Sequence, residues 1–327
     1  MREQILAMMM KNPEAYFSGE EMARQLGITR AAVWKHIDAL KKIGCTFDSK
    51  PNRGYRLLSV PDVLAPEILS TYDFTGITQR CKFKVVESTT STNDLGRTLA
   101  GKGAQDGLVV LAEEQTKGRG RMARAWVGEK GQALMISLVL RPPIRPTDAA
   151  KIPLIAGLAV ARAVQQQTGL DARVKWPNDV LIGNRKICGI LTEMTAEWDR
   201  VESIVCGVGI NVNQRAFPKE IENVATSLYL QTGQEQARGQ LLLAFLTEFF
   251  TYYDMWIKRG DFSRIVTAYT KMSMLLGEEV VIDVYGKKMA GTCIGFDRDG
   301  CLVIEREGKR KRIVAGDISV RSAKTYV

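Results

Sequence analysis

The stretch Leu108–Leu140, LVVLAEEQTKGRGRMARAWVGEKGQALMISLVL, decides the fold class of this chain. The apolar run Leu108–Ala112 leads into the loop Gly118–Ala123, and a second apolar run, Ala133–Leu140, follows. The loop fits the pattern G-x-G-x-x-A, but in dinucleotide-binding folds that loop opens directly into a helix. Because a strand follows here, we exclude a Rossmann domain and expect two strands joined by a basic loop.

The loop carries arginine at two positions, Arg119 and Arg121, between its glycines. Glycine lets the backbone fold tightly over a ligand, and two guanidinium groups suit a carboxylate and a phosphate together. An exposed basic turn is the simpler alternative. Trp126 follows the loop and can stack on a purine base, although a lone tryptophan near a strand is more often part of the core.

Two further segments place polar residues inside strand-like runs. In Lys175-Trp176-Pro177-Asn178-Asp179, the carboxylate of Asp179 suits Mg²⁺ and Lys175 suits a phosphate. Lys186 lies in an apolar run and either enters a site or extends its amine to solvent. No P-loop pattern is present, so any nucleotide is held by another device.

Outward from this centre, residues 83–272 mix strand-like runs such as Ser203–Val208 with long helical patterns at Ile152–Gln167 and Gln240–Ile257. We therefore predict an α+β domain with a mixed sheet. Three short alternating runs follow, at Val280–Val284, Ala290–Phe296 and Cys301–Glu305. They predict an SH3-like β-barrel over 273–327. The basic run 309–312 is expected to be a solvated turn, and a role with the acceptor or the nucleotide stays open.

The first 62 residues predict a winged helix-turn-helix. Ser18 and Glu21 form an S-x-x-E capping box, and Thr29 is the N-cap of a second helix that runs to about Ile43. A hairpin with an Asn-Arg-Gly turn follows as the wing. The alternatives are an ordinary helical hairpin that does not bind DNA and a module that contacts another protein. Under the DNA-binding interpretation, the contacts come from Thr29, Arg30, Lys35, His36, Lys50 and Arg53.

The composition of the chain limits the classes of catalytic and metal sites that it can form. The chain has 327 residues and a formal net charge of +10, which favours polyanionic or phosphate-bearing partners. The simpler alternative is that the excess lysine keeps the surface soluble. Its single histidine, His36, excludes Ser-His-Asp catalysis and histidine-rich metal sites. The cysteines form no CxxC pair, and the N-terminus resembles neither a signal peptide nor a membrane span. We expect reduced thiols, a cytoplasmic protein and no membrane partner.

Five segments, taken in order, resemble the motif series of biotin protein ligases. They are Ser91-Thr92-Asn93, Gln115–Arg121, Lys175–Asp179, Arg185–Leu191 and Gly207–Asn213. The winged helix and the small C-terminal domain resemble the bifunctional branch, the biotin operon repressors. The resemblance implies domains at 1–62 for DNA, 63–82 as linker, 83–272 for catalysis, and 273–327.

The resemblance also implies roles for single residues. Biotin is expected to contact Ser91, Thr92, Asn93, Gln115, Gly118, Arg119, Gly120, Arg121, Lys186 and Gly189. ATP is expected to contact Arg119, Arg121, Trp126, Lys175, Asn178 and Asn211. Lys186, Arg121 and Asp179 are the catalytic candidates, with Asp179 also the ligand of Mg²⁺.

The implied reaction uses ATP to form biotinyl-5′-adenylate, beneath a lid made by Gly118–Trp126, and transfers biotin to a lysine of a carrier domain. The implied partners are the biotin carboxyl carrier domain of acetyl-CoA carboxylase and of other biotin-dependent carboxylases, the operator DNA of biotin genes, and a second copy in a ligand-linked homodimer. Two alternatives stay open: a ligand-sensing repressor that transfers nothing, and a lipoate ligase.

Overall fold

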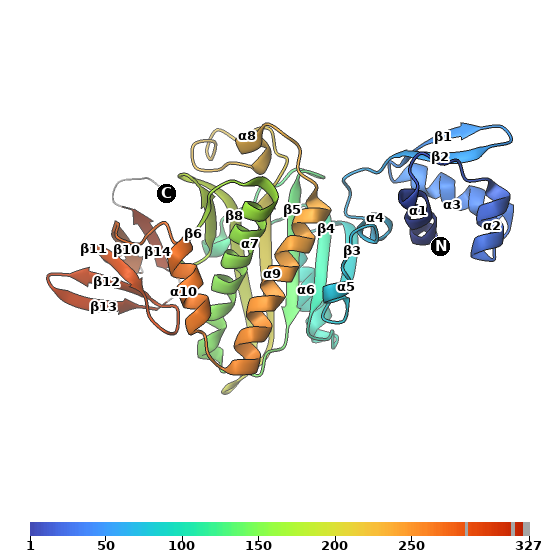
Figure 1. The fold of residues 1–327 in the computed structure, drawn as a ribbon. Helices are drawn as coiled ribbons and strands as arrows, with labels where there is room; N and C mark the ends of the chain where they lie inside the picture. The colour runs from blue at the N-terminus through green and yellow to red at the C-terminus, as the bar shows by residue number, and fades with distance from the viewer. Residues whose placement is uncertain (285–286, 315–317, 323–327) are drawn as a thin grey trace. The chain divides into compact units, whose positions relative to one another are not determined.

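The structure is a computed structural model that describes residues 1–284, 287–314 and 318–322 (Figure 1). The chain forms two compact units. One comprises Met1–Thr75 together with Ala237–Gly239, and the other comprises Gly76–Gln236 and Gln240–Val327. Each unit has its own hydrophobic core, and we describe them separately.

The first unit is a winged helix-turn-helix, as the sequence predicts. Its elements are α1 (Arg2–Lys11), α2 (Gly19–Leu26), α3 (Arg30–Lys42), β1 (Thr46–Lys50), β2 (Gly54–Ser59) and α4 (Pro66–Leu69). The side chains of Ser18 and Thr29 cap α2 and α3, accepting hydrogen bonds from the backbone N–H of Glu21 at 3.0 Å and of Ala32 at 3.2 Å. These caps satisfy N–H groups that have no partner within their helices.

The core of this unit lies between its helices. Val33, Ile37 and Leu40 form the buried stripe of α3 that their helical spacing predicts. The wing packs against the segment before α2, where Phe17 and Tyr55 exchange two backbone hydrogen bonds of 2.9 Å. Gly54 allows this contact, because a Cβ there would lie 2.0 Å from the carbonyl oxygen of Phe17 and its φ is +96°.

A seven-stranded mixed sheet forms the centre of the second unit, in the order β3-β4-β5-β9-β8-β7-β6. The strands are β3 (Lys82–Thr89), β4 (Leu108–Gln115), β5 (Ala133–Leu140), β6 (Ala172–Lys175), β7 (Asp179–Ile182), β8 (Arg185–Glu197) and β9 (Arg200–Asn211). Only β3 and β4 pair in parallel, and the other neighbours are antiparallel. The mixed sheet confirms the predicted α+β class.

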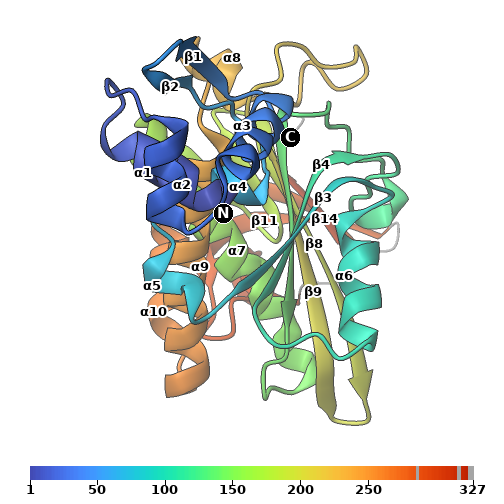
Figure 2. The same cartoon turned by 90° about the vertical axis from the view of Figure 1, so that its right-hand side faces the viewer.

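Helices cover both faces of this sheet (Figure 2). One face is covered by α6 (Thr92–Gly101), and the other by α7 (Ile152–Thr168), α9 (Arg238–Arg259) and α10 (Ser263–Met272). The short elements are α5 (Thr75–Thr78), η1 (Arg121–Ala123), η2 (Pro146–Lys151) and α8 (Leu228–Thr232). Because both faces are covered, β5 is buried at every position.

The C-terminal domain is a five-stranded antiparallel sheet in the order β13-β12-β11-β10-β14, in keeping with the predicted SH3-like fold. Its strands are β10 (Glu279–Val284), β11 (Lys287–Phe296), β12 (Leu302–Arg306), β13 (Lys309–Ile313) and β14 (Ile318–Ser322). The turn before β12 packs on the central domain, where the indole N–H of Trp176 donates to the carbonyl oxygen of Gly300 at 3.0 Å.

The prediction of a solvated turn over residues 309–312 was wrong. These residues form β13, which pairs with β12, and the turn lies two residues earlier at Glu307 and Gly308, both with positive φ. A two-residue turn of this kind closes a hairpin. The basic side chains are exposed on an edge strand, where charge opposes pairing with another chain.

The six cysteines are free and buried, as expected for reduced thiols. Burial raises the pKa of Cys45 and Cys81 to about 11 and that of Cys206 to about 12. Within the three described ranges, no helix combines the length and the apolarity that crossing a membrane requires.

Candidate functional site

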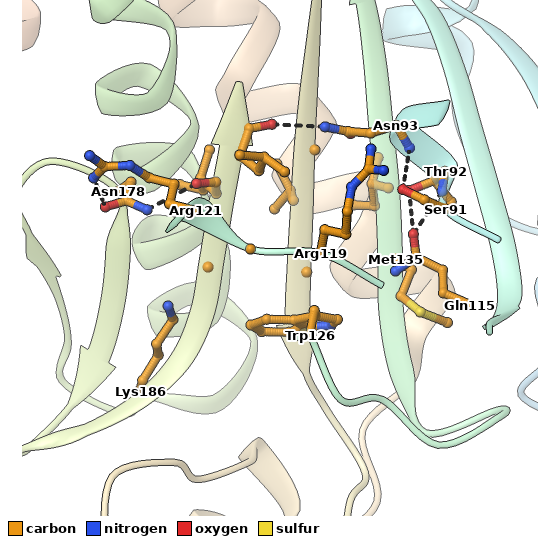
Figure 3. A pocket seen from close by; sticks show the side chains of 18 residues that line it. Ser91, Thr92, Asn93, Gln115, Arg119, Arg121, Trp126, Met135, Asn178 and Lys186 are labelled. Carbon is orange, nitrogen blue, oxygen red and sulfur yellow. Dashed lines mark hydrogen bonds between the residues drawn. The ribbon is translucent and has the colours of Figure 1, made fainter. Parts of the chain in front are cut away.

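One pocket on the central sheet brings together most of the predicted ligand-binding residues (Figure 3). Its walls come from the start of α6, from strands β4, β5, β8 and β9, from the loop after β4, and from the turn between β6 and β7. The lining residues are Ser91, Thr92, Asn93, Gln115, Arg119, Gly120, Arg121, Trp126, Met135, Ile136, Asn178, Lys186, Gly189, Ile190, Leu191, Gly207, Val208 and Gly209.

One end of the pocket is neutral and polar. Ser91 is the N-cap of α6, and its hydroxyl oxygen accepts from the backbone N–H of Asn93 at 3.2 Å. The side-chain carbonyl of Gln115 accepts from the backbone N–H of Thr92 at 2.7 Å. That bond fixes the orientation of the Gln115 amide and leaves its NH₂ group to donate elsewhere.

Asn93 supports this end and is itself almost fully buried. Its amide nitrogen donates to the carbonyl oxygen of Leu191 at 3.2 Å and to Glu193 at 2.8 Å, and its oxygen accepts from the hydroxyl of Ser137 at 2.7 Å. Gly207 makes room, because a Cβ there would lie 2.2 Å from the oxygen of Asn93. The predicted biotin contact at Asn93 is therefore a side chain with three partners inside the protein.

The other end of the pocket is cationic. Lys186 Nζ lies 2.6 Å from Asp179 Oδ1, and a guanidinium nitrogen of Arg121 donates to Asn178 at 2.8 Å. Asp179 Oδ1 is buried, and the ammonium of Lys186 is the partner that the structure gives it. The apolar run around Lys186 thus does not carry its amine away to solvent; the amine faces the pocket (Figure 3).

Arg119 lies between the two ends and is held by acidic residues. It donates to Asp94 at 2.6 Å and lies 3.8 Å from Glu193. Arg97 shares both acids, at 2.7 Å and 3.5 Å. Because the side chain of Arg119 is 42% exposed, its ion pairs with these acids are weak, and a ligand anion can replace them.

Trp126 lies against a floor of glycine. Gly189 and Gly209 are paired across β8 and β9, and a Cβ at Gly209 would come within 2.5 Å of the indole. Lys186 Nζ lies 5.9 Å from the centre of the indole ring, within the range of a cation–π contact. The indole N–H is buried without a partner among the described residues. Trp126 is therefore part of the pocket rather than of the core.

Four of the predicted ligand residues lie outside the lining: Gly118, Lys175, Asn211 and Asp179, which contacts the lining residue Lys186. Gly118 closes the loop, where its carbonyl oxygen accepts from the backbone N–H of Trp126 at 2.9 Å. Lys175 is buried on β6. Asn211 is also buried; it donates to the carbonyl oxygen of Thr226 and accepts from Gln214, both at 3.0 Å.

Sequence reasoning missed part of the site. It assigned no role to the apolar wall, which is formed by Met135, Ile136, Ile190, Leu191 and Val208, or to Gly207 and Gly209. It also missed Ser137, which lies beneath the pocket. Two features of the sequence could have indicated these residues. Glycine occupies every second position in GVGIN, residues 207–211, and Ser137 is the one polar residue of β5.

The wing of the first unit gathers positive charge around one aromatic ring. Lys50, Arg53 and Arg56 lie 5.1, 4.5 and 5.2 Å from the centre of the Tyr16 ring. The hydroxyl of Tyr16 hydrogen-bonds Asp48; this bond, with the nearby cations, holds the pKa of Asp48 below its usual range. Tyr16 therefore holds two of the predicted DNA contacts together.

The outer face of α3 presents the other predicted DNA contacts. Thr29, Arg30 and Lys35 are exposed, whereas His36 is half-buried. Trp34, which the sequence analysis did not select, is 58% exposed on the same helix. An exposed tryptophan on a second helix is suited to apolar contact with a base edge.

The chain is similar to proteins of known families in both units. Residues 83–211 match the biotin/lipoate A/B protein ligase family, and residues 1–56 match a helix-turn-helix domain. The bifunctional ligase/repressor BirA of Bacillus spizizenii is 33% identical over 98% of both chains. BirA of Escherichia coli is 29% identical over 94% of both chains.

A solved structure shows the same fold. The biotin protein ligase of Aquifex aeolicus, in complex with biotin and ATP, matches with a TM-score of 0.66 at 30% identity, covering 74% of this chain and 99% of that one. That match covers the fold of the pocket, while the BirA relatives span both units. The chain therefore belongs to the biotin/lipoate A/B protein ligase family, in the group of bifunctional ligase/repressors of the BirA type.

Proposed function

We propose that this chain activates biotin with ATP, transfers it to a lysine of a carrier domain and represses transcription by binding DNA. One observation carries the ligase function: a single pocket has a neutral hydrogen-bonding end, a cationic end, and Trp126 with Arg119 between them (Figure 3). Biotin is itself divided in this way, into an uncharged ureido ring and a carboxylate.

In the first step, an oxygen of the biotin carboxylate attacks the α-phosphorus of ATP, the new P–O bond forms, and diphosphate leaves. Ser91, Thr92 and Gln115 hold the ureido ring. Arg121 and Lys186 lie at the opposite end, where they neutralise the charge on the carboxylate and the phosphoryl oxygens. No side-chain nucleophile is needed, which agrees with the single histidine.

Trp126 is proposed to stack on the adenine, with Asn178 beside it. Arg119 would exchange Asp94 and Glu193 for the ligand anion when the loop Gly118–Trp126 closes. Closure protects the mixed anhydride from water. Lys175 and Asn211 do not line the pocket. They would act on the nucleotide indirectly, by positioning the strands whose residues contact it.

Mg²⁺ fits the site as an ion carried mainly by the phosphates. Within the described residues, no group of three or more His, Cys, Asp or Glu side chains could hold a metal. Asp179, whose buried Oδ1 lies beside Lys186 at the cationic end of the pocket, is the one carboxylate proposed to contact the ion. Bound there, Mg²⁺ would neutralise phosphate charge, and it commonly binds one or two carboxylates together with phosphate oxygens.

In the second step, the amine of an acceptor lysine attacks the acyl carbon of the adenylate, an amide forms and AMP leaves. The proposed acceptors are the carrier domains of acetyl-CoA carboxylase and other biotin-dependent carboxylases. We expect the protein to act in the cytoplasm, at operator DNA of biotin genes. Division of the chain at 1–62, 63–82, 83–272 and 273–327 is part of the same proposal.

Repression is proposed to require a two-fold dimer, because paired half-sites on DNA need two winged helices. If the adenylate favours the dimer, operator affinity rises with adenylate, and the coupling is reciprocal. Sedimentation with and without biotinyl-5′-adenylate tests this proposal. An unchanged monomer–dimer equilibrium, together with unchanged operator affinity, would exclude ligand-linked repression.

The ligase proposal is tested by incubating the protein with ATP and a carrier domain, with either labelled biotin or labelled lipoate. We expect labelled biotin, and not labelled lipoate, to be transferred to the carrier lysine, with release of AMP. Transfer of lipoate would instead support a lipoate ligase. Binding of biotin without any transfer would leave a ligand-sensing repressor.

A further inference from the structure

The polar residue beneath the pocket, Ser137, is completely buried in the middle of β5. Its hydroxyl oxygen lies 2.7 Å from the oxygen of Asn93 and 2.8 Å from the hydroxyl oxygen of Thr92. Thr92 Oγ1 in turn lies 3.0 Å from Gln115 Oε1. Three short oxygen–oxygen contacts therefore share only two hydroxyl protons.

The positions of these protons follow from what each group can do. The oxygen of Asn93 is an acceptor, because the amide nitrogen is oriented by Leu191 and Glu193. Ser137 must therefore donate to Asn93. The contact between Ser137 and Thr92 then contains a proton only if Thr92 donates to Ser137 rather than to Gln115 Oε1, and the shorter distance to Ser137, 2.8 Å against 3.0 Å, favours this direction. Gln115 Oε1 is satisfied without that proton, because it accepts the backbone N–H of Thr92.

We propose that Ser137 is a positioning residue that sets the hydrogen-bond polarity of the neutral end of the pocket, and so makes it select a ureido group. With its proton drawn inward, Thr92 presents an acceptor to the ligand. Ser91, whose oxygen accepts from Asn93, presents its O–H. Gln115 presents its NH₂. Two donors beside an acceptor match the C=O and N–H of a cyclic urea.

This inference rests on the proposed use of biotin and adds a residue that does not itself line the pocket. Without Ser137, the Thr92 hydroxyl is free to turn its proton toward the ligand, against a ureido N–H. Asn93 also loses the donor to its buried oxygen. Leaving buried polar groups without partners weakens binding substantially.

The test is steady-state adenylation by the full-length protein carrying Ser137→Ala. We expect the KM for biotin to rise by about fivefold to a hundredfold, with kcat and the KM for ATP within about twofold. Ser137→Thr, which keeps the hydroxyl, should restore the KM. Ser203→Ala, in a buried serine of β9 that does not line the pocket, is the matched control and should change neither KM.

A second readout separates polarity from simple loosening of the site. Biotins methylated at one ureido nitrogen lack an N–H, and the wild type should discriminate against at least one of them. Ser137→Ala should narrow that discrimination, because Thr92 is then able to donate. If Ser137→Ala does not fold, Ser137→Cys, whose thiol is a weak donor, replaces it with the same expectations.

The inference is overturned if the KM for biotin stays within twofold, if both KM values rise together, or if discrimination against the methylated biotins is unchanged. These outcomes are distinct from failure of the proposed function, because if that function failed, the wild type itself would form no adenylate from biotin.

Discussion

The two ends of the pocket hold their side chains in opposite ways. At the neutral end, Thr92 and Asn93 are locked by hydrogen bonds to the protein, with distances of 2.7 to 3.2 Å. At the cationic end, Lys186 and Arg121 are held by Asp179 and by the neutral Asn178. A locked end recognises a fixed shape, whereas an end held by exchangeable partners accommodates charge that changes during a reaction.

The largest effect should come from removing charge at the cationic end. Lys186→Ala is expected to lower adenylate formation by at least about a hundredfold, since one well-placed charge in a closed site contributes about 2.7–4 kcal/mol to the transition state. The measurement is single-turnover formation of AMP-linked biotin. Arg185→Ala, in an exposed neighbour on the same strand, is the control. Activity of Lys186→Ala within a few-fold of wild type, in a folded protein, would contradict the assignment.

A smaller effect is expected from the boundary between the two ends. Gly209→Ala would place a methyl group 2.5 Å from the indole of Trp126, so the ring must move. We expect the KM for ATP to rise by about tenfold, as for loss of one aromatic contact to a base of about 1–3 kcal/mol. Gly101→Ala, where a methyl group meets nothing within 4 Å, should have no effect. An unchanged KM for ATP would remove Trp126 from the nucleotide site.

Arg53 on the wing and Lys35 on α3 belong to the first unit, which supplies no lining residue of the ligand pocket. Arg53→Ala or Lys35→Ala should weaken DNA binding and lower the salt dependence of log K by about one phosphate contact. Fluorescence anisotropy over a range of salt concentrations measures the slope. Biotin transfer should be unchanged, and its loss in either variant would mean that the two activities are not separable.

The smallest effect is expected from the thiols. Burial raises the pKa of Cys188, which lies next to the cationic end, far above that of a free thiol. The thiolate is the reactive form, so an alkylating reagent at pH 8 should leave adenylation of the native protein within twofold. Rapid inactivation, with mass spectrometry locating the label on Cys188, would show that this end of the pocket opens further than the structure implies.

Much of the fold was predictable from local chemistry. Capping residues located α2 and α3, and a strand after the glycine-arginine loop excluded the Rossmann fold. The basic run 309–312 was predicted wrongly, because a strand and a turn differ there only in the pairing partner, β12, which the local sequence does not specify.

The chemical types of the site residues were predictable, but their partners were not. Neither the capture of Arg119 by Asp94 nor the enclosure of Asn93 follows from sequence spacing, since both depend on contacts between α6 and other elements. Ser137 was missed for the same reason. A serine in an apolar strand signals a buried hydrogen bond, and only the fold identifies what it binds.

The central claim is that the neutral end selects biotin and the cationic end activates it. Single-turnover adenylate formation, measured over a range of biotin concentrations for Gln115→Leu and Lys186→Met, tests it most directly. We predict that Gln115→Leu raises the half-saturating biotin concentration by about tenfold at an unchanged maximal rate. Lys186→Met should lower the maximal rate by at least about a hundredfold, with a smaller change in half-saturation. If both variants lower the same parameter by similar factors, the two ends do not have separate roles.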